Sequence, residues 1–174
     1  MIFLNGLLTL DNSTTIIQQI LQDCTNGDDL VIYINSGGGS IRGLRNIVDI
    51  LKICNKPITT ICAGYCASSA AILFLQGSTR LILPDSELIY HEPRYTFSKG
   101  DTITYSDILN LSKDSKNNLA FFISEMVKVS KFTKEDLEDK ILPGKELSLN
   151  AKQALRYGFA TKICQDLNEI TSII

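Results

Sequence analysis

Short apolar runs and helical patterns alternate along most of this 174-residue chain, and this alternation restricts the fold more than any other feature. Residues 30–34 form a continuous apolar run between turn residues, which is typical of a strand buried on both faces of a sheet. On either side of this run, around residues 16–24 and 41–51, apolar residues recur at helical spacing. Further short strands are expected at residues 3–4, 58–63, 80–83 and 87–90. Such units, joined by short connections, predict an α/β fold with a mainly parallel sheet.

Helices dominate the second half of the chain. Residues 104–129 predict one long helix, with apolar side chains on one side and Lys, Asp and Asn on the other. At ~1.5 Å per residue this helix is roughly 35 Å long, more than a domain of this size needs to cover its sheet. We therefore expect part of it to project or to pack on another subunit. Shorter helices are expected at residues 68–76, 133–140 and 151–158, and a loop at residues 6–12.

Composition favours one globular domain over residues 1–174, because 44% of the residues are hydrophobic and 21% are charged. A net charge of -2 without a basic run argues against a nucleic-acid partner. The beginning of the chain does not look like a secretory signal, and the densest apolar run, residues 70–75, is far shorter than the ~20 residues of a membrane span. We expect a soluble, cytoplasmic protein with no membrane partner; an organellar matrix or stroma is the alternative.

The chain has an odd number of cysteines, no Cys-x-x-Cys pair and a single histidine. A zinc site needs more histidines or closer cysteine pairs, so we predict no metal site. Several of the cysteines fall in apolar segments, where a thiol behaves as a small hydrophobic side chain. We therefore expect free, buried thiols in a reducing compartment at Cys24, Cys54, Cys62, Cys66 and Cys164.

A glycine-rich turn follows the apolar run at residues 30–34. The segment Asn-Ser-Gly-Gly-Gly-Ser at residues 35–40 leads from this expected strand into a helix. Glycines let the backbone turn sharply and present its N–H groups to an anion, either a phosphate or the oxyanion of a tetrahedral intermediate. A tight connection without any ligand fits the same pattern. The G-x-x-x-x-G-K-[ST] phosphate loop is absent, which disfavours a nucleotide site.

Ser68 and His91 are the candidates for acyl chemistry. Ser68 lies among small residues at a predicted strand-to-helix bend, which exposes its hydroxyl beside the first N–H groups of the helix. The same position also suits a helix N-cap. His91 ends the strand expected at residues 87–90, where a structural role is the alternative. Because a serine hydroxyl is a poor nucleophile without a base, the chemistry requires these two side chains to meet.

In this combination the sequence resembles the proteolytic subunit of the Clp protease, ClpP. The matching blocks come in the family's order and span about residues 3–163; they lie at residues 34–39, 57–71, 83–86, 89–93 and 151–158. The resemblance implies a ClpP/crotonase-like core of repeated strand-strand-helix units, with a projecting handle over about residues 94–130. It also implies Ser68 as nucleophile, His91 as general base and then acid, and the backbone N–H groups of Gly39 and Ser69 as the oxyanion hole.

Two positions depart from the family's motifs. Counting back from Tyr157 and Gly158, the aspartate of the family falls on Glu146. Glutamate also orients an imidazole, but its extra methylene requires adjusted geometry. The stretch 141–147 is about two residues longer than in the family, so Asp139 remains a second candidate. The glycine turn lacks the family's proline, which leaves its N–H donors in place.

The resemblance further implies a serine endopeptidase that forms two stacked heptameric rings and cleaves unfolded chains or short peptides. The subunit itself needs no cofactor, since a partner AAA+ unfoldase uses the ATP. Tyr33 matches a position in the pocket that docks this ATPase, although a strand tyrosine also serves packing. The family's segment before the first core strand lines the axial pore. This sequence starts almost at that strand, so we expect the segment to be missing or gating to differ.

Two other functions remain open from the sequence. A catalytically impaired ring subunit would explain the altered acid and the altered N-terminal segment. An acyl-CoA enzyme of the crotonase type would use the backbone N–H groups to hold a thioester enolate, and Ser68 and His91 would then be incidental.

Overall fold

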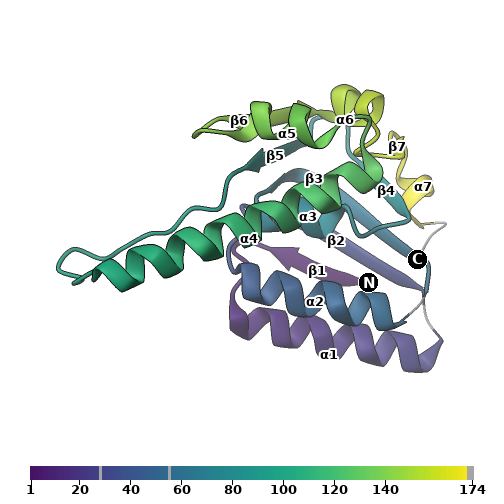
Figure 1. Ribbon diagram of the computed structural model, residues 1–174. Helices are drawn as coiled ribbons and strands as arrows, with labels where there is room; N and C mark the ends of the chain where they lie inside the picture. The colour runs from purple at the N-terminus through teal and green to yellow at the C-terminus, as the bar shows by residue number, and fades with distance from the viewer. Residues whose placement is uncertain (28, 55, 172–174) are drawn as a thin grey trace.

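The computed structural model describes residues 1–27, 29–54 and 56–171 (Figure 1). Residues 28, 55 and 172–174, which belong to the domain expected over residues 1–174, lie outside the described residues. The strands are β1 (Ile2–Asn5), β2 (Leu30–Ser36), β3 (Ile58–Ala67), β4 (Thr79–Ile82), β5 (Glu87–His91), β6 (Glu146–Asn150) and β7 (Lys162–Ile163). The helices are α1 (Leu10–Asn26), α2 (Ile41–Cys54), α3 (Ser69–Phe74), α4 (Tyr105–Val129), α5 (Lys134–Ile141), α6 (Ala151–Tyr157) and α7 (Leu167–Thr171).

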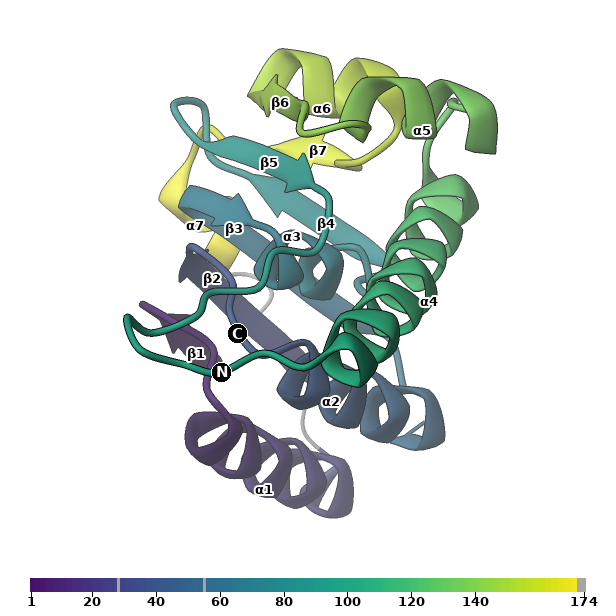
Figure 2. The same ribbon diagram turned by 60° about the vertical axis from the view of Figure 1, so that its left-hand side comes forward.

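The sheet is parallel except at one edge. Its main path runs β1-β2-β3-β4-β7, and every neighbouring pair on this path is parallel. Strand β5 pairs in parallel with the end of β3, and β6 pairs antiparallel with β5. Helices α1, α2 and α3 cover one face of the sheet (Figures 1 and 2). The predicted α/β class with a mainly parallel sheet and a long helix is confirmed.

On the edge away from β2, strand β3 pairs with two different neighbours along its length. Its first half lies beside β4, and residues 65–67 lie beside β5. Between the two halves, Gly64 has a φ of 88°, and a Cβ there would lie 2.8 Å from Asn35 Oδ1, so only glycine fits without strain. The sequence pattern predicted that this strand stops at residue 63. It instead continues to Ala67 and carries Ser68 to the end of β5.

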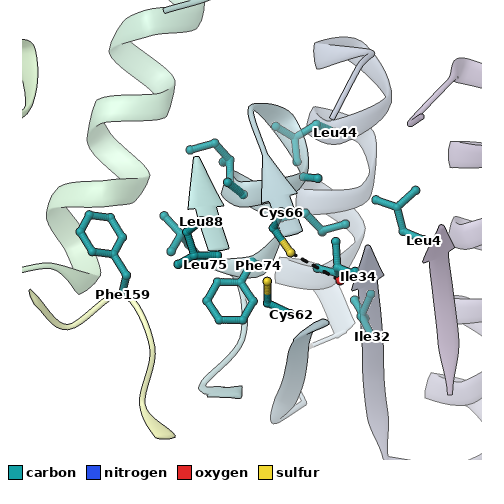
Figure 3. Close-up of a cluster of buried hydrophobic side chains, with 14 of the residues drawn as sticks. Leu4, Ile32, Ile34, Leu44, Cys62, Cys66, Phe74, Leu75, Leu88 and Phe159 are labelled. Atoms are coloured by element: carbon teal, nitrogen blue, oxygen red, sulfur yellow. Dashed lines mark hydrogen bonds between the residues drawn. The ribbon is translucent and has the colours of Figure 1, made fainter. Parts of the chain in front are cut away.

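The main core lies between the sheet and the helices. Alternate residues of β2, Leu30, Ile32 and Ile34, are fully buried on this side, as the period of a strand requires. Figure 3 shows Ile32 and Ile34 beside Cys62, Cys66 and Phe74 in this cluster. A smaller cluster covers the opposite face of the sheet and contains Val31, Ile61, Leu81 and Cys164. The expectation that this strand is buried on both faces is confirmed at Val31, whereas Tyr33 is only half-buried.

Helix α4 extends well beyond the sheet (Figure 1). Its C-terminal half is anchored in the core by Phe122, Ile123 and Met126. Its N-terminal half leaves Tyr105 and Ile108 exposed. The predicted surplus length is therefore confirmed. Among the described helices, none combines the length and the apolar character that crossing a membrane requires.

One local prediction was wrong, and three short elements were missed. The first long helix begins at Leu10 inside the expected loop, because Thr9 and Asn12 form a reciprocal capping box. Strand β6 was missed, although Leu147 and Leu149 alternate with polar residues as in a half-buried strand. The short elements β7 and α7 were also missed.

The cysteine prediction is wrong for two of the five residues. Cys24 and Cys54 form a disulfide, with Cα atoms 6.2 Å apart, that joins the ends of α1 and α2. This pairing could not be predicted from a sequence separation of 30 residues, because it depends on how the two helices pack. The prediction of free, buried thiols is confirmed for Cys62, Cys66 and Cys164.

Candidate functional site

Ser68 occupies a strained bend between β3 and α3. Its φ of 54° and ψ of -126° make it the only non-glycine residue with a positive φ in the described part of the chain. Such a conformation costs on the order of 1–3 kcal/mol and persists where the surroundings enforce it, often at functional sites. The Ser68 N–H donates to the Ile89 carbonyl over 2.9 Å. Ser68 occupies the N-cap position of α3, but its side chain makes no capping hydrogen bond, so the hydroxyl does not serve as the cap.

The glycine turn packs directly against this bend. Gly38 has a φ of 89°, and a Cβ there would lie 2.5 Å from the Ala67 oxygen and 2.8 Å from Ser68 Cβ. Both the left-handed conformation and the close approach therefore require glycine. Ser36 Oγ accepts a hydrogen bond from the Gly38 N–H at 3.1 Å and stabilises the turn. No role was expected for Gly38 from the sequence, where its signal was the run of three glycines.

The two predicted oxyanion donors lie on backbone segments that touch at Ser68. Leu8 binds the turn through the Gly38 carbonyl at 2.7 Å and the Ser40 N–H at 2.8 Å, which leaves the Gly39 N–H out of this bridge. Ser69 is the first residue of α3, and the first hydrogen bond of this turn runs from the Ile72 N–H to the Ser68 carbonyl. The Ser69 N–H comes before this donor and is therefore not used within the helix. A Cβ on Gly38 would lie 3.0 Å from Ser69 N, so the glycine turn and the start of α3 are in contact.

His91 ends β5, two residues beyond the residue that binds the Ser68 N–H. The pairing of Ala67 with Ile89 sets this register. His91 Nδ1 lies 2.7 Å from the Glu92 carbonyl oxygen. A carbonyl only accepts, so Nδ1 carries the proton in this contact and Nε2 of the neutral ring is left as the acceptor. A histidine that takes a proton from a serine requires this tautomer.

Glu146 lies directly opposite His91 in the antiparallel pairing of β5 and β6. Directly paired residues on adjacent strands have Cβ atoms about 4.5–5.5 Å apart and point to the same face. The Glu146 carboxylate, however, accepts a hydrogen bond from Arg94 Nη2 at 2.7 Å. The structure thus brings Glu146 beside His91, but the Glu146 carboxylate binds Arg94, a residue that sequence reasoning missed.

Asp139, the second candidate acid, has a different environment. It lies in α5, and its carboxylate pairs with Lys145 Nζ at 3.3 Å. Its side chain is 83% exposed. Strand pairing places Glu146 opposite His91, whereas Asp139 lies on a helix and is not paired with His91 in the sheet.

Buried groups beneath the bend are poor nucleophiles. Burial raises the pKa of the Cys66 thiol well above its usual value, and the neighbouring Cys62 raises it further. Figure 3 shows Cys66 inside the apolar cluster, where its thiol faces the Ile34 carbonyl at 3.5 Å. A thiol is nucleophilic only as the thiolate. Ser68, which is half-exposed, is therefore the better nucleophile in this part of the structure.

A hollow of about 270 Å³ lies next to Gly39. Arg42, Arg94, Tyr95 and Asp114 also line it. Tyr33 lies apart from this hollow, on β2, where its ring is 5.4 Å from that of the exposed Phe3. No group of three metal-ligating side chains is present among the residues with described positions.

A serine at a strained strand-to-helix bend, with an imidazole on the neighbouring strand, is typical of the serine hydrolases. A family model described as Clp protease matches residues 1–166. The chain therefore belongs to the Clp protease family.

Curated relatives agree with this family. The chain is 32% identical over 142 residues to "ATP-dependent Clp protease proteolytic subunit 4" of Streptomyces avermitilis, covering 78% of this chain and 58% of the relative. It is 30% identical over 148 residues to the "proteolytic subunit 2" of Leifsonia xyli, covering 84% and 65%. It is 28% identical over 171 residues to the "proteolytic subunit" of Carsonella ruddii, covering 93% and 82%. The chain thus spans less than two thirds of the length of the first two relatives.

Proposed function

We propose that this chain is a serine endopeptidase, the proteolytic subunit of an ATP-dependent Clp-type protease. The observation that carries the proposal is the bend at Ser68, whose backbone is strained while its hydroxyl is not used as a helix cap. The Ser68 N–H binds β5, the strand that ends in His91, and the glycine turn packs against the same bend. Strain held at such a position supports a functional role better than a structural one.

In the proposed reaction, His91 Nε2 takes the Ser68 proton as Oγ attacks a peptide carbonyl. The Gly39 and Ser69 N–H groups stabilise the negative charge that develops on the carbonyl oxygen. Removing one such donor typically costs about 3–4 kcal/mol of transition-state stabilisation. His91 then protonates the leaving amine, and water hydrolyses the acyl-enzyme by the same steps. Glu146 serves as the acid that orients and stabilises the protonated imidazole.

We extend the proposal to the assembly of this chain. Residues 1–174 form one protease domain, and α4 with the preceding segment is the handle that joins two heptameric rings. An AAA+ unfoldase supplies unfolded chains at the expense of ATP, and the subunit itself uses no cofactor. The names of the relatives, which describe ATP-dependent proteases, support this assignment. We propose a cytoplasmic location and a docking role for Tyr33 on the basis of the family resemblance alone.

The direct test is Ser68→Ala. We expect the wild type to react with a fluorophosphonate probe and to hydrolyse short fluorogenic peptides, and we expect the variant to lose both activities by at least ~10³-fold. Ser124→Ala is the matched control, because this exposed hydroxyl donates to the Phe121 carbonyl in its own helix. Hydrolysis that persists in Ser68→Ala would falsify the assignment.

A second candidate is an impaired subunit that only completes a ring. The contact between Glu146 and Arg94 favours it, because this carboxylate is then withheld from His91. Purified protein that forms rings but neither binds the probe nor cleaves peptides would establish this alternative.

A further inference from the structure

Two hydrogen bonds engage the groups that a triad would pair with each other. His91 Nδ1 is bonded to the Glu92 carbonyl, and the Glu146 carboxylate is bonded to Arg94. Both bonds are 2.7 Å long, so both are well formed. For Glu146 to orient the imidazole, its carboxylate has to replace the Glu92 carbonyl at Nδ1.

The segment that carries Arg94 is held near Glu146 from two sides. Glu92 Oε1 accepts a hydrogen bond from the Gly144 N–H at 2.9 Å, which ties the end of β5 to the loop before β6. Pro93 is buried, and its ring restricts the backbone just before Arg94. These contacts hold the backbone at Arg94 close to Glu146, which the Arg94 side chain binds.

The two partners of Nδ1 are not equivalent in catalysis. When His91 takes a proton from Ser68, its ring becomes positive, and a carboxylate stabilises this charge better than a neutral carbonyl does. The charged side chains of the residues in these contacts are those of Glu92, Arg94 and Glu146. Of these, Glu92 is bonded to Gly144, and only Arg94 competes directly for the Glu146 carboxylate.

We propose that Arg94 is a positioning residue that withholds Glu146 from His91 and thereby lowers the peptidase activity. This inference rests on the proposed function. Arg94 and Glu146 are about half exposed, with side-chain exposures of 55% and 49%, so their ion pair biases the equilibrium only modestly. The protonated imidazole formed in the reaction competes with Arg94 for the same carboxylate.

The test is Arg94→Gln in the full chain, assayed with a neutral fluorogenic peptide. We expect kcat to rise by about two- to five-fold with KM unchanged, the range by which an exposed ion pair biases an equilibrium. Arg94→Lys keeps the positive charge, so we expect its kcat to stay as low as that of the wild type. Added salt activates the wild type more than Arg94→Gln, since it screens the exposed pair.

Two further variants separate this role from a general effect of charge. Glu146→Gln introduced into Arg94→Gln removes the gain, because no carboxylate is left to release. Lys145→Gln removes a neighbouring cation from Asp139 instead, and we expect no gain from it. An Arg94→Gln enzyme that is no faster than the wild type, or a Lys145→Gln enzyme that is equally activated, overturns the inference. Absence of Ser68-dependent hydrolysis in the wild type and in Arg94→Gln overturns the proposed function instead.

Discussion

At the scale of single residues, Tyr90, which precedes His91 in the chain, is buried in the hydrophobic core. Successive side chains of β5 point to opposite faces, so Tyr90 turns away from the candidate site. Its ring packs on Phe159, with ring centres 5.0 Å apart. Its hydroxyl is fully buried and has no hydrogen-bond partner among the described residues. An unsatisfied buried hydroxyl costs on the order of 1–3 kcal/mol.

We therefore expect Tyr90→Phe to raise the free energy of unfolding at pH 7 by about 1 kcal/mol, because the orphaned hydroxyl is removed. Burial raises the pKa of Tyr90 well above its usual value, and Cys66 and Cys62 add to this shift. A raised folded-state pKa leaves stability intact below about pH 10, where unfolded tyrosine ionises, and removes it as the pH rises further. Urea denaturation at pH 7 and above pH 10 measures both effects. The advantage of the variant should grow at high pH; equal pH dependence in both proteins would contradict this account.

At the scale of elements, α1 and α2 form a closely packed pair. A Cβ on Gly43 of α2 would lie 3.0 Å from Ser13 Cβ of α1, so glycine permits the close approach of these helices. The disulfide between Cys24 and Cys54 fastens their C-terminal ends. It closes a chain segment of 30 residues and so restricts the unfolded chain.

Breaking this disulfide should lower the free energy of unfolding by up to about 3–4 kcal/mol, the loop-closure value for a segment of this length. Denaturant midpoints measured with and without dithiothreitol test this. The midpoint of the wild type should fall on reduction, whereas that of Cys54→Ser should not change. Cys24→Ser is the matched control and should be as stable as Cys54→Ser. A wild type that is insensitive to the reductant refutes the prediction.

At the scale of the whole molecule, the N-terminal half of α4 is an arm that the described part of this chain does not cover. Ile108 is 56% exposed and Leu109 is 52% exposed. The capping box of Thr104 and Asp107 secures the start of this arm, and the Thr104 hydroxyl lowers the pKa of Asp107 by donating to its carboxylate. A helix that presents apolar side chains to water is best stabilised by a partner surface. This supports the proposed contact between two rings.

Leu109→Glu should separate the two rings, because it would bury a charge in the proposed contact. We expect the assembly's mass in analytical ultracentrifugation to fall by about half, while the far-ultraviolet circular dichroism stays the same, since position 109 is exposed in the single chain. Asn110→Glu adds the same charge one position later, on a different side of the helix, and serves as the control. A Leu109→Glu protein that keeps the wild-type mass argues against the handle assignment.

The amino-acid sequence by itself determined most of the elements and the position of the candidate nucleophile. Hydrophobic periodicity and capping are local, so they identified the strands β1 to β5 and the long helix α4. The same local pattern placed Ser68 at a bend and His91 at the end of a strand. Strand β6 carried a readable alternation that was overlooked.

Only the tertiary structure decided which of these residues meet. The path of β3 past Gly64 brings Ser68 to β5, and the pairing of β5 with β6 sets Glu146 opposite His91. The contact of Arg94 with Glu146 spans 52 residues, and the disulfide of α1 and α2 spans 30. Such contacts depend on strand register and helix packing, which arise from the whole chain. The state of the proposed triad therefore follows from these long-range contacts and not from the motifs that contain its members.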